Sequence, residues 1–220
     1  KQANFWEQLV TPRYYTDVNG NACHDESKTE LNEGEKYIII PGYSPENHPI
    51  GYSSTLTANA TMDIAAARDG LDMVCSIEKA VGREGSDEAI EKWQDLKSKI
   101  SDYKFDDDGA LREWAMEEYE ENNNHRHLSH LYVAWPAYET QSNPELAIAA
   151  NIALNNRNKY NTSDATAGHG WMHKALVEAR LKRGDGMMSS LLKMMNGTAY
   201  YSSFMTDHDT NRRNDTYCTD

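Results

Sequence analysis

Apolar residues recur every three or four positions between residues 60 and 81, and this spacing constrains the fold more than any other feature of the sequence. Side chains at these spacings lie on one face of an α-helix. The pattern therefore predicts a helix with one buried face, ending at Gly82, because glycine readily adopts the left-handed conformation found at helix ends. The stripe consists of Ala60, Ile64, Ala67, Leu71, Val74, Ile77 and Val81.

Helical signals also dominate the rest of the chain. Ser86 and Asp185 are typical N-cap residues, and Asn143 followed by Pro144 favours a helix start, since proline is tolerated at the first helical position. Pro136 is expected to stop a shorter helix that begins near Leu128. The expected helices cover residues 86–100, 128–135, 143–156, 171–182 and 185–197, and the buried stripe of the first is Ile90, Trp93, Leu96 and Ile100.

Two long stretches, residues 12–56 and 198–220, lack helical periodicity. Within the first, Tyr37 to Ile40 is a short apolar run that fits either a strand or a buried extended segment. Long loops between regular helices are common places for functional sites. We therefore predict an all-α chain with long loops, in which residues 1–220 form a single partial domain. Because the first residues read like the middle of a helix, we expect a fragment of a longer protein.

Composition excludes several classes of function. The formal net charge of −13 argues against binding to nucleic acid or to anionic membrane surfaces. No apolar run approaches the ~20 residues needed to span a bilayer, so membrane insertion is not expected. The chain has no CxxC pair, no GxGxxG or Walker loop and no GxSxG elbow, so we expect no cofactor. The cysteines Cys23, Cys75 and Cys218 are odd in number and form no disulfide framework.

The loop at residues 41–49 contains three prolines, a glycine and, near its centre, Glu46. A general acid needs a fixed position and a raised pKa, which a rigid and partly apolar loop can supply. Composition alone also allows the plainer interpretation that Glu46 is an exposed carboxylate in a turn.

Three histidines and an arginine lie within residues 125–130. His127 and His130 are three positions apart, so they could share one helix face as zinc ligands. However, the chain has no HExxH motif and no thiolate nearby to complete a tetrahedral site. We therefore expect no metal. Arg126 and His127 are better suited to donating hydrogen bonds to sugar hydroxyls, with aromatic rings stacking on the sugar.

Taken in order, six segments resemble the catalytic domain of the 1,2-α-L-fucosidases, glycoside hydrolase family 95. The match of residues 125–132 to the family's HRHxSHLY motif is the most specific. The other segments resemble an SPEN loop, an MD-containing helix start, a G-x-L-x-E-W element, a GW segment and a QIDG-like sequence. They lie at residues 43–47, 59–63, 108–114, 170–171 and 217–220.

The resemblance implies an (α/α)₆ barrel of six helical hairpins, of which this chain would be roughly the carboxyl-side half. It also implies hydrolysis with inversion at the anomeric carbon. By this resemblance Glu46 is the proton donor, and Asp220 helps to polarise the attacking water together with two asparagines from an upstream segment. Arg126, His127 and Trp171 are expected to bind the terminal sugar. The expected partners are a glycan or oligosaccharide substrate and the remainder of the same catalytic domain.

The chain departs from the family pattern near its end, where Cys218 and Thr219 stand in place of the usual Q-I. Specificity is therefore expected for fucose or for L-galactose, which adds a hydroxyl at C6. A catalytically silent, carbohydrate-binding helical domain is the alternative from another class. The resemblance implies a secreted, periplasmic or cell-surface protein. Sequons at Asn59, Asn161, Asn196 and Asn214 add little, because the chain is rich in asparagine.

Overall fold

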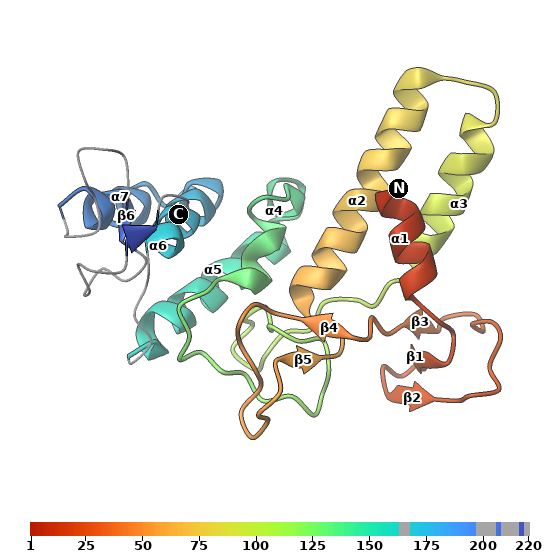
Figure 1. The fold of residues 1–220 in the computed structure, drawn as a ribbon, viewed down its shortest axis with the longest axis horizontal. Helices are drawn as coiled ribbons and strands as arrows, with labels where there is room; N and C mark the ends of the chain where they lie inside the picture. The colour runs from red at the N-terminus through yellow and green to blue at the C-terminus, as the bar shows by residue number, and fades with distance from the viewer. Residues whose placement is uncertain (163–167, 197–205, 208–215, 218–220) are drawn as a thin grey trace. The chain divides into compact units, whose positions relative to one another are not determined.

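The computed structural model describes residues 1–162, 168–196, 206–207 and 216–217. Two compact units are apparent from its contacts (Figure 1). The first unit consists of residues 1–104 and 112–121. The second consists of residues 105–111 and the described residues after 121. Each unit is described by itself.

Three helices form one side of the first unit. They are α1 (Gln2–Leu9), α2 (Thr61–Val81) and α3 (Ser86–Ser98). The helices α2 and α3 form an antiparallel hairpin, with α1 beside α2 (Figure 1). The helix predicted from the apolar stripe is confirmed, and it ends at Gly82, which has a φ of 58°. Glycine takes this left-handed conformation without the steric cost that a Cβ would add.

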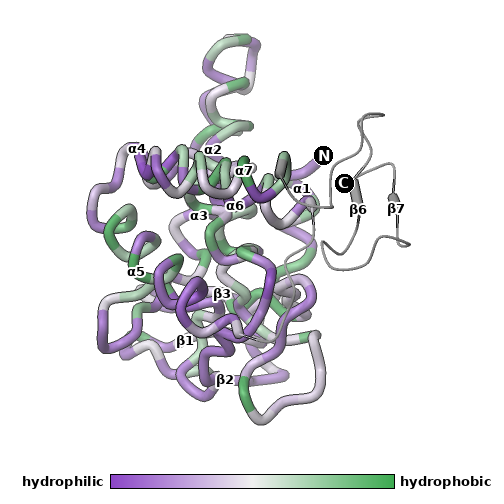
Figure 2. Tube along the Cα trace, turned by 90° about the vertical axis from the view of Figure 1, so that its left-hand side faces the viewer, coloured by the Kyte–Doolittle hydropathy of each residue, from purple (hydrophilic) through white to green (hydrophobic). Residues whose placement is uncertain are grey.

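The core of the first unit lies where α1, α2 and α3 meet. Ile64, Ala67 and Leu71 of α2 are fully buried there. They pack in one cluster with Ala3, Trp6, Ile39, Trp93, Leu96, Ile100 and Ala115. The predicted stripe is not buried along its whole length, because Ile77 is 53% and Val81 62% exposed. In this unit only α3 runs beside that end of α2, as Figure 1 shows, so one face of the helix stays uncovered. In Figure 2 the same end projects away from the rest of the first unit.

The turn between α2 and α3 corrects one prediction. Ser86 is not the N-cap of α3 but its first helical residue, and Gly85 occupies the cap position. The Ser86 hydroxyl instead donates a 3.0 Å hydrogen bond to the buried carboxylate of Glu78. Arg83 also donates to Glu78, at 3.0 Å from Nε. The serine therefore fixes the turn rather than the helix terminus.

Residues 12–56, predicted to be irregular, contain short strands. β1 (Tyr14–Thr16), β2 (Ala22–His24) and β3 (Lys36–Tyr37) form an antiparallel sheet in the order β2-β1-β3. β4 (Gly42–Tyr43) pairs with β5 (Leu56–Thr57). Ile38 and Ile39, which follow β3, are buried as the apolar run predicts. The chain is therefore mainly helical, and the all-α prediction missed these strands.

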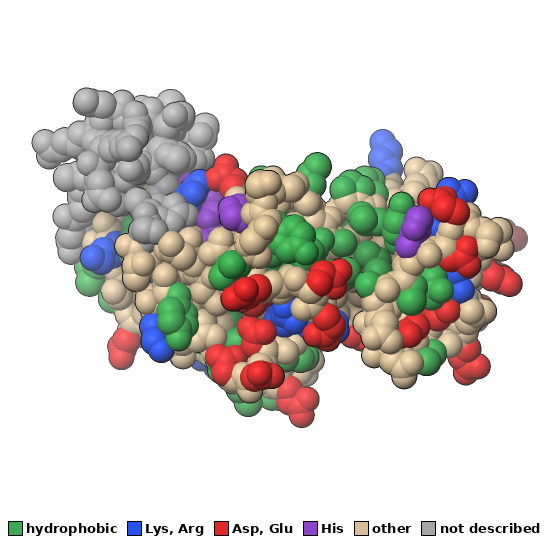
Figure 3. Space-filling model, turned by 90° about the horizontal axis from the view of Figure 1, so that it is seen from below, with side chains coloured by type: hydrophobic (Ala, Val, Ile, Leu, Met, Phe, Trp, Pro, Cys, Tyr) green, Lys and Arg blue, Asp and Glu red, His purple; other side chains and the backbone are tan. Residues whose placement is uncertain are grey.

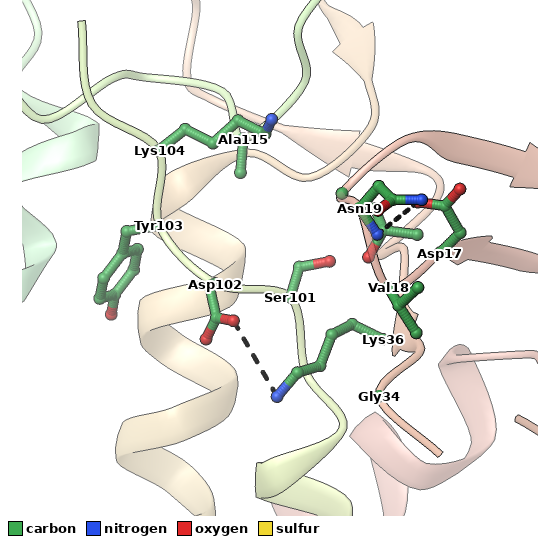
Figure 4. Close-up of a pocket in the computed structure, with 12 residues that line it drawn as sticks. Asp17, Val18, Asn19, Gly34, Lys36, Ser101, Asp102, Tyr103, Lys104 and Ala115 are labelled. Atoms are coloured by element: carbon green, nitrogen blue, oxygen red, sulfur yellow. Dashed lines mark hydrogen bonds and ion pairs between the residues drawn. The ribbon is translucent and has the colours of Figure 1, made fainter. Parts of the chain in front are cut away.

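A polar pocket of about 340 Å³ lies between the β1–β2 turn and residues 101–104 (Figure 4). Asp17 closes the turn by accepting 2.9 Å hydrogen bonds from the backbone N of Asn19 and of Asn21. The Lys36 amino group lies 4.0 Å from the Asp102 carboxylate across the pocket (Figure 4). None of the residues 41–49 lines it, so the pocket is distinct from the proline-rich loop.

The second unit contains η1 (Ser129–Val133), α4 (Glu139–Ser142), α5 (Pro144–Tyr160), α6 (Gly168–Arg180) and α7 (Gly184–Asn196), and the paired strands β6 (Thr206–Asp207) and β7 (Thr216–Tyr217). The predicted start of α5 is confirmed, because the Asn143 side chain accepts a 3.1 Å hydrogen bond from Leu146 N. α7 begins at Gly184, one residue before the predicted cap Asp185. In the part of the chain that the structure describes, no helix combines the length and hydrophobicity needed to cross a membrane.

Candidate active site

The proline-rich loop projects one carboxylate outward between two buried polar residues. Ser44 and Asn47 are 0% and 1% exposed, whereas Glu46 between them is exposed. The peptide bonds before Pro41 and before Glu46 are cis. The loop follows directly from β4, whose pairing with β5 fixes its first residues. Glu46 therefore lies on a short segment with a buried polar residue on each side.

The side chain that holds the loop is Glu113, which is fully buried. Its Oε1 accepts a 2.6 Å hydrogen bond from Ser44 Oγ, and its Oε2 accepts a 2.7 Å hydrogen bond from Asn47 Nδ2. Bonds to an ionised acceptor are shorter and stronger than those between neutral groups. We call the set of Ser44, Asn47 and Glu113 the carboxylate clamp. It fixes the residues on either side of Pro45 and Glu46.

Glu113 is itself fixed by its backbone. Its N–H lies 2.9 Å from both carboxylate oxygens of Glu121, and its carbonyl oxygen accepts a 2.9 Å hydrogen bond from Thr61 N. The Thr61 hydroxyl donates to the carbonyl oxygen of Arg112 at 2.6 Å. The segment that carries Glu113 is thus joined to the start of α2, so the clamp rests on a regular helix.

Asp63, in the first turn of α2, supports the loop from its other end. Its Oδ2 accepts a 2.8 Å hydrogen bond from the backbone N of Tyr43. Burial raises the pKa of Asp63 to about 6, against the opposing effect of that hydrogen bond. A Cβ at Gly42 would lie 3.2 Å from Asp63 Oδ2 and 3.3 Å from Asn59 N. The close approach of loop and helix therefore favours glycine at position 42, because a Cβ would force its neighbours to shift by a few tenths of an ångström.

Asn59 ties the residues before the loop to the start of α2. Its Oδ1 accepts a 2.8 Å hydrogen bond from Ile39 N, and its Nδ2 donates one of 2.9 Å to Ser101 Oγ. The residue is 0% exposed and has a φ of 48°, a conformation that asparagine tolerates better than most residues. In the folded chain the first sequon is therefore a buried structural element.

In the second unit, the predicted sugar-binding residues Arg126 and Trp171 line one pocket of about 110 Å³. Burial lowers the pKa of Lys174, which also lines it, against the opposing effect of the Glu178 carboxylate. The Lys174 amino group lies 5.2 Å from the centroid of the Trp171 ring. The remaining lining residues are Leu128, Arg157, Asn158, Asn161 and Gly170. An aromatic ring beside amides and cations is a set of groups that suits a polyhydroxylated ligand.

Arg157 of α5 fixes the backbone of the histidine segment. It is 2% exposed, and its Nη1 donates hydrogen bonds to the carbonyl oxygens of His127 and, at 3.4 Å, of His125. The ring of His127 stacks on that of His169 with centroids 5.2 Å apart. His127 therefore lies next to α6, which also carries Trp171, although it is not among the described residues that line the pocket.

A zinc site at the histidine segment would need further ligands close to His127 and His130. Within residues 1–162 and 168–196, no group of three or more His, Cys, Asp or Glu side chains could hold a metal ion. The Cys23 and Cys75 side chains are free thiols, each partly exposed. Acidic side chains are spread over the face drawn in Figure 3, in keeping with the net charge of −13.

The predicted residues thus fall into two groups. Glu46 belongs to the first unit, whereas Arg126, His127 and Trp171 belong to the second. Asp220 and the departures at Cys218 and Thr219 lie outside the described residues. Reasoning from residue patterns missed the roles of Glu113, Asp63, Asn59 and Arg157. Three of them lie in segments quoted for the family resemblance, which was the signal that could have drawn attention to them.

Comparison with known proteins agrees with these segments. Residues 15–215 match the family model described as glycosyl hydrolase family 95 catalytic domain. The chain is 30% identical over 152 residues to a protein of Arabidopsis thaliana named alpha-L-fucosidase 2. That alignment covers 66% of this chain but 17% of the relative, so the chain spans a small part of that protein's length. The chain belongs to the glycosyl hydrolase family 95 catalytic domain family.

Proposed function

We propose that this chain is part of an inverting exo-α-glycosidase that releases terminal α-linked L-fucose or L-galactose from oligosaccharides or glycans. The observation that carries the proposal is the carboxylate clamp, which holds the loop on both sides of an exposed Glu46. A general acid must be held within hydrogen-bond reach of the leaving oxygen, and a clamped loop meets that need. Family membership and the name of the plant relative support the same reaction class.

In the proposed reaction, the protonated Glu46 carboxyl donates its proton to the glycosidic oxygen as the bond from that oxygen to the anomeric carbon breaks. A water molecule attacks the anomeric carbon from the opposite face, and its proton passes to a carboxylate base. We assign that base to Asp220, which the resemblance places beside two upstream asparagines. Inversion requires the two carboxyl groups to lie about 6.5–9.5 Å apart so that the water fits between them and the sugar.

The pocket of the second unit is the proposed site for the terminal sugar. Arg126 would donate hydrogen bonds to its hydroxyls, and Trp171 would stack on the ring. We propose that His127, which lies beside α6 but does not line this pocket, supplies a further donor. Fucose and L-galactose differ by one hydroxyl at C6. A polar partner for that hydroxyl would favour L-galactose strongly, because a buried partner left unpaired is costly.

The proposal extends to architecture and location. We propose that the chain forms roughly the carboxyl-side half of an (α/α)₆ barrel, and that the remainder of the same domain supplies the water-positioning asparagines. The isolated chain would then show no turnover. The resemblance further suggests a secreted, periplasmic or cell-surface protein.

Replacing Glu46 with Gln in the complete protein tests the proposal. We expect hydrolysis of phenyl α-L-fucoside to fall by about 10²–10⁴-fold, the usual contribution of a general acid. Binding of free fucose should persist. Glu118→Gln, which changes another exposed carboxylate of the first unit, should leave the rate unchanged. Unchanged hydrolysis in Glu46→Gln would refute Glu46 as the acid. A wild-type protein that binds fucose but hydrolyses neither α-L-fucosides nor α-L-galactosides would instead indicate the catalytically silent carbohydrate-binding domain.

A further inference from the structure

We infer that Glu113 is a positioning residue for the proton donor and sets where the Glu46 carboxyl lies relative to the scissile bond. The inference rests on the proposed function, since it assigns a role in the reaction proposed for Glu46. It depends on the geometry of the clamp, in which one buried carboxylate accepts side-chain hydrogen bonds from both neighbours of the Pro45-Glu46 dipeptide.

A carboxylate suits this position for a chemical reason. Ser44 Oγ and Asn47 Nδ2 both donate, at 2.6 Å and 2.7 Å, and they bond to different oxygens of Glu113. An ionised carboxylate has two accepting oxygens, whereas a glutamine amide has one accepting oxygen and a donating NH₂ group. In Glu113→Gln, the NH₂ group of glutamine would face either the Asn47 amide or the Ser44 hydroxyl. The facing group, which donates in the wild type, would have to rotate so that it accepts instead. The clamp would lose one of its two accepting oxygens and part of its geometry.

The burial of Glu113 points to the same role. A buried carboxylate is costly unless hydrogen bonds compensate it, and two of the side chains that donate to Glu113, Ser44 and Asn47, belong to the loop. The carboxylate and the loop therefore stabilise each other. The opposite end of α2 offers a contrast, because Glu78 there is 7% exposed and accepts from Ser86 and Arg83, which only shape a turn.

Proton donation is sensitive to small displacements, since a catalytic group must be held within about 0.5 Å of its productive position. Loosening the clamp would move Glu46 without removing it. The loss of hydrolysis rate should then depend on how much the leaving group needs a proton. Phenol is a poor leaving group that needs protonation, whereas fluoride departs with little help from an acid.

The experiment compares hydrolysis of phenyl α-L-fucoside and α-L-fucosyl fluoride by the complete protein and its variants. For Glu113→Gln we expect kcat on the phenyl glycoside to fall about tenfold or more, with KM little changed, and kcat on the fluoride to fall less than about threefold. Ser44→Ala should shift the ratio of the two rates in the same direction. Glu78→Gln removes a buried carboxylate of the same unit that also accepts from a serine, and it should leave the ratio unchanged.

The ratio of rates does not depend on how much of a variant is folded, so partial misfolding leaves the test valid. If Glu113→Gln yields no folded protein, Ser44→Ala and Asn47→Ala carry the same test. Equal losses on both substrates would overturn the positioning role, even if the enzyme remains a glycosidase. A wild-type protein that hydrolyses neither these fucosyl substrates nor the corresponding L-galactosyl substrates would overturn the proposed function itself.

Discussion

The carboxylate of Asp63 accepts a 2.8 Å hydrogen bond from the backbone N of Tyr43, which joins the first turn of α2 to the loop that carries Glu46. Burial nevertheless raises the pKa of Asp63 to about 6. The effect of desolvation on the pKa of Asp63 therefore outweighs that of the single hydrogen bond. The ionised form is less stable at this position than it would be in water.

This balance predicts that the contribution of Asp63 to stability falls as pH rises. In the unfolded chain Asp63 loses its proton near pH 4, whereas in the folded chain it keeps the proton up to about pH 6. At Asp63 the folded state binds more protons between these values, so the contribution of this residue to stability is greatest below about pH 4 and declines until about pH 6. The decline attributable to Asp63 is at most about 3 kcal/mol.

Asp63→Asn keeps an acceptor for Tyr43 N but cannot ionise. The difference in free energy of unfolding between variant and wild type should therefore increase in favour of the variant as pH rises from about 4 to about 7. Urea denaturation at several pH values measures this difference. A difference that stays constant with pH would show that Asp63 titrates normally in the folded protein.

Asn59 should be replaceable only at a cost in stability. Asn59→Ala removes the hydrogen bonds to Ile39 and Ser101 and places alanine at a φ of 48°. We expect a loss of about 2–4 kcal/mol. Asn59→Gly loses the same hydrogen bonds but tolerates the φ, so it should be about 1 kcal/mol less destabilising. Thermal denaturation compares the two variants, and equal losses would show that backbone conformation contributes nothing.

Asn59 should also carry no glycan in the folded protein, because its side chain is fully buried. Peptide mass spectrometry of protein expressed in a glycosylating host tests this expectation. A folded, glycosylated Asn59 would contradict the burial of the start of α2.

Arg157 should be required for the shape of the histidine segment. Arg157→Met removes donors to the buried carbonyl oxygen of His125 and to the partly buried one of His127. We expect a loss of stability of about 2–4 kcal/mol and weaker fucose binding. Arg157→Lys should restore only part of both, because an ammonium group lacks the planar fork of guanidinium.

The matched control is Arg183→Met, since Arg183 also belongs to the second unit and bonds to side chains of α5, namely Asn151 and Asn155. It should leave fucose binding unchanged. Calorimetric titration with fucose compares the affinities of the two variants. Equal effects on binding would argue against a specific role for Arg157.

Trp171 should contribute directly to sugar binding. Removal of the ring in Trp171→Ala should weaken fucose binding by about tenfold, whereas Trp171→Phe should have a smaller effect because it keeps an aromatic face. Quenching of tryptophan fluorescence by fucose should also decrease in both variants. Undiminished affinity in Trp171→Ala would place the sugar elsewhere.

Helix positions were predictable where one local signal decided them. The 3.6-residue period located α2, and the Asn143-Pro144 pair located the start of α5, because both signals act within a few residues. Strands of two or three residues, such as β3 and β4, are too short to show alternation. Their pairing depends on distant partners, which no local pattern specifies.

The side chains that support the Glu46 loop could not be predicted from the sequence, and the role of Glu46 itself remains a proposal. The prolines around Glu46 indicated a rigid loop, and the resemblance gave the residue its role. Nothing in the neighbourhood of Glu113 indicates a buried carboxylate, because its partners lie almost seventy positions earlier. The exposed Ile77 and Val81 show the converse, since an apolar period predicts a face suited to burial but not what covers it.

The clamp also has a consequence for the order in which the protein is made. Ser44 and Glu113 are 69 positions apart in the sequence, so residue 44 emerges from the ribosome well before its partner. The loop cannot take its final shape until the chain has been synthesised past residue 113, and past residue 121, which holds the backbone of Glu113. A nascent chain interrupted earlier could form the α2–α3 hairpin yet would still lack the carboxylate clamp that fixes the loop around Glu46. The loop that carries Glu46 is therefore shaped only after the residues of the α2–α3 hairpin have been synthesised.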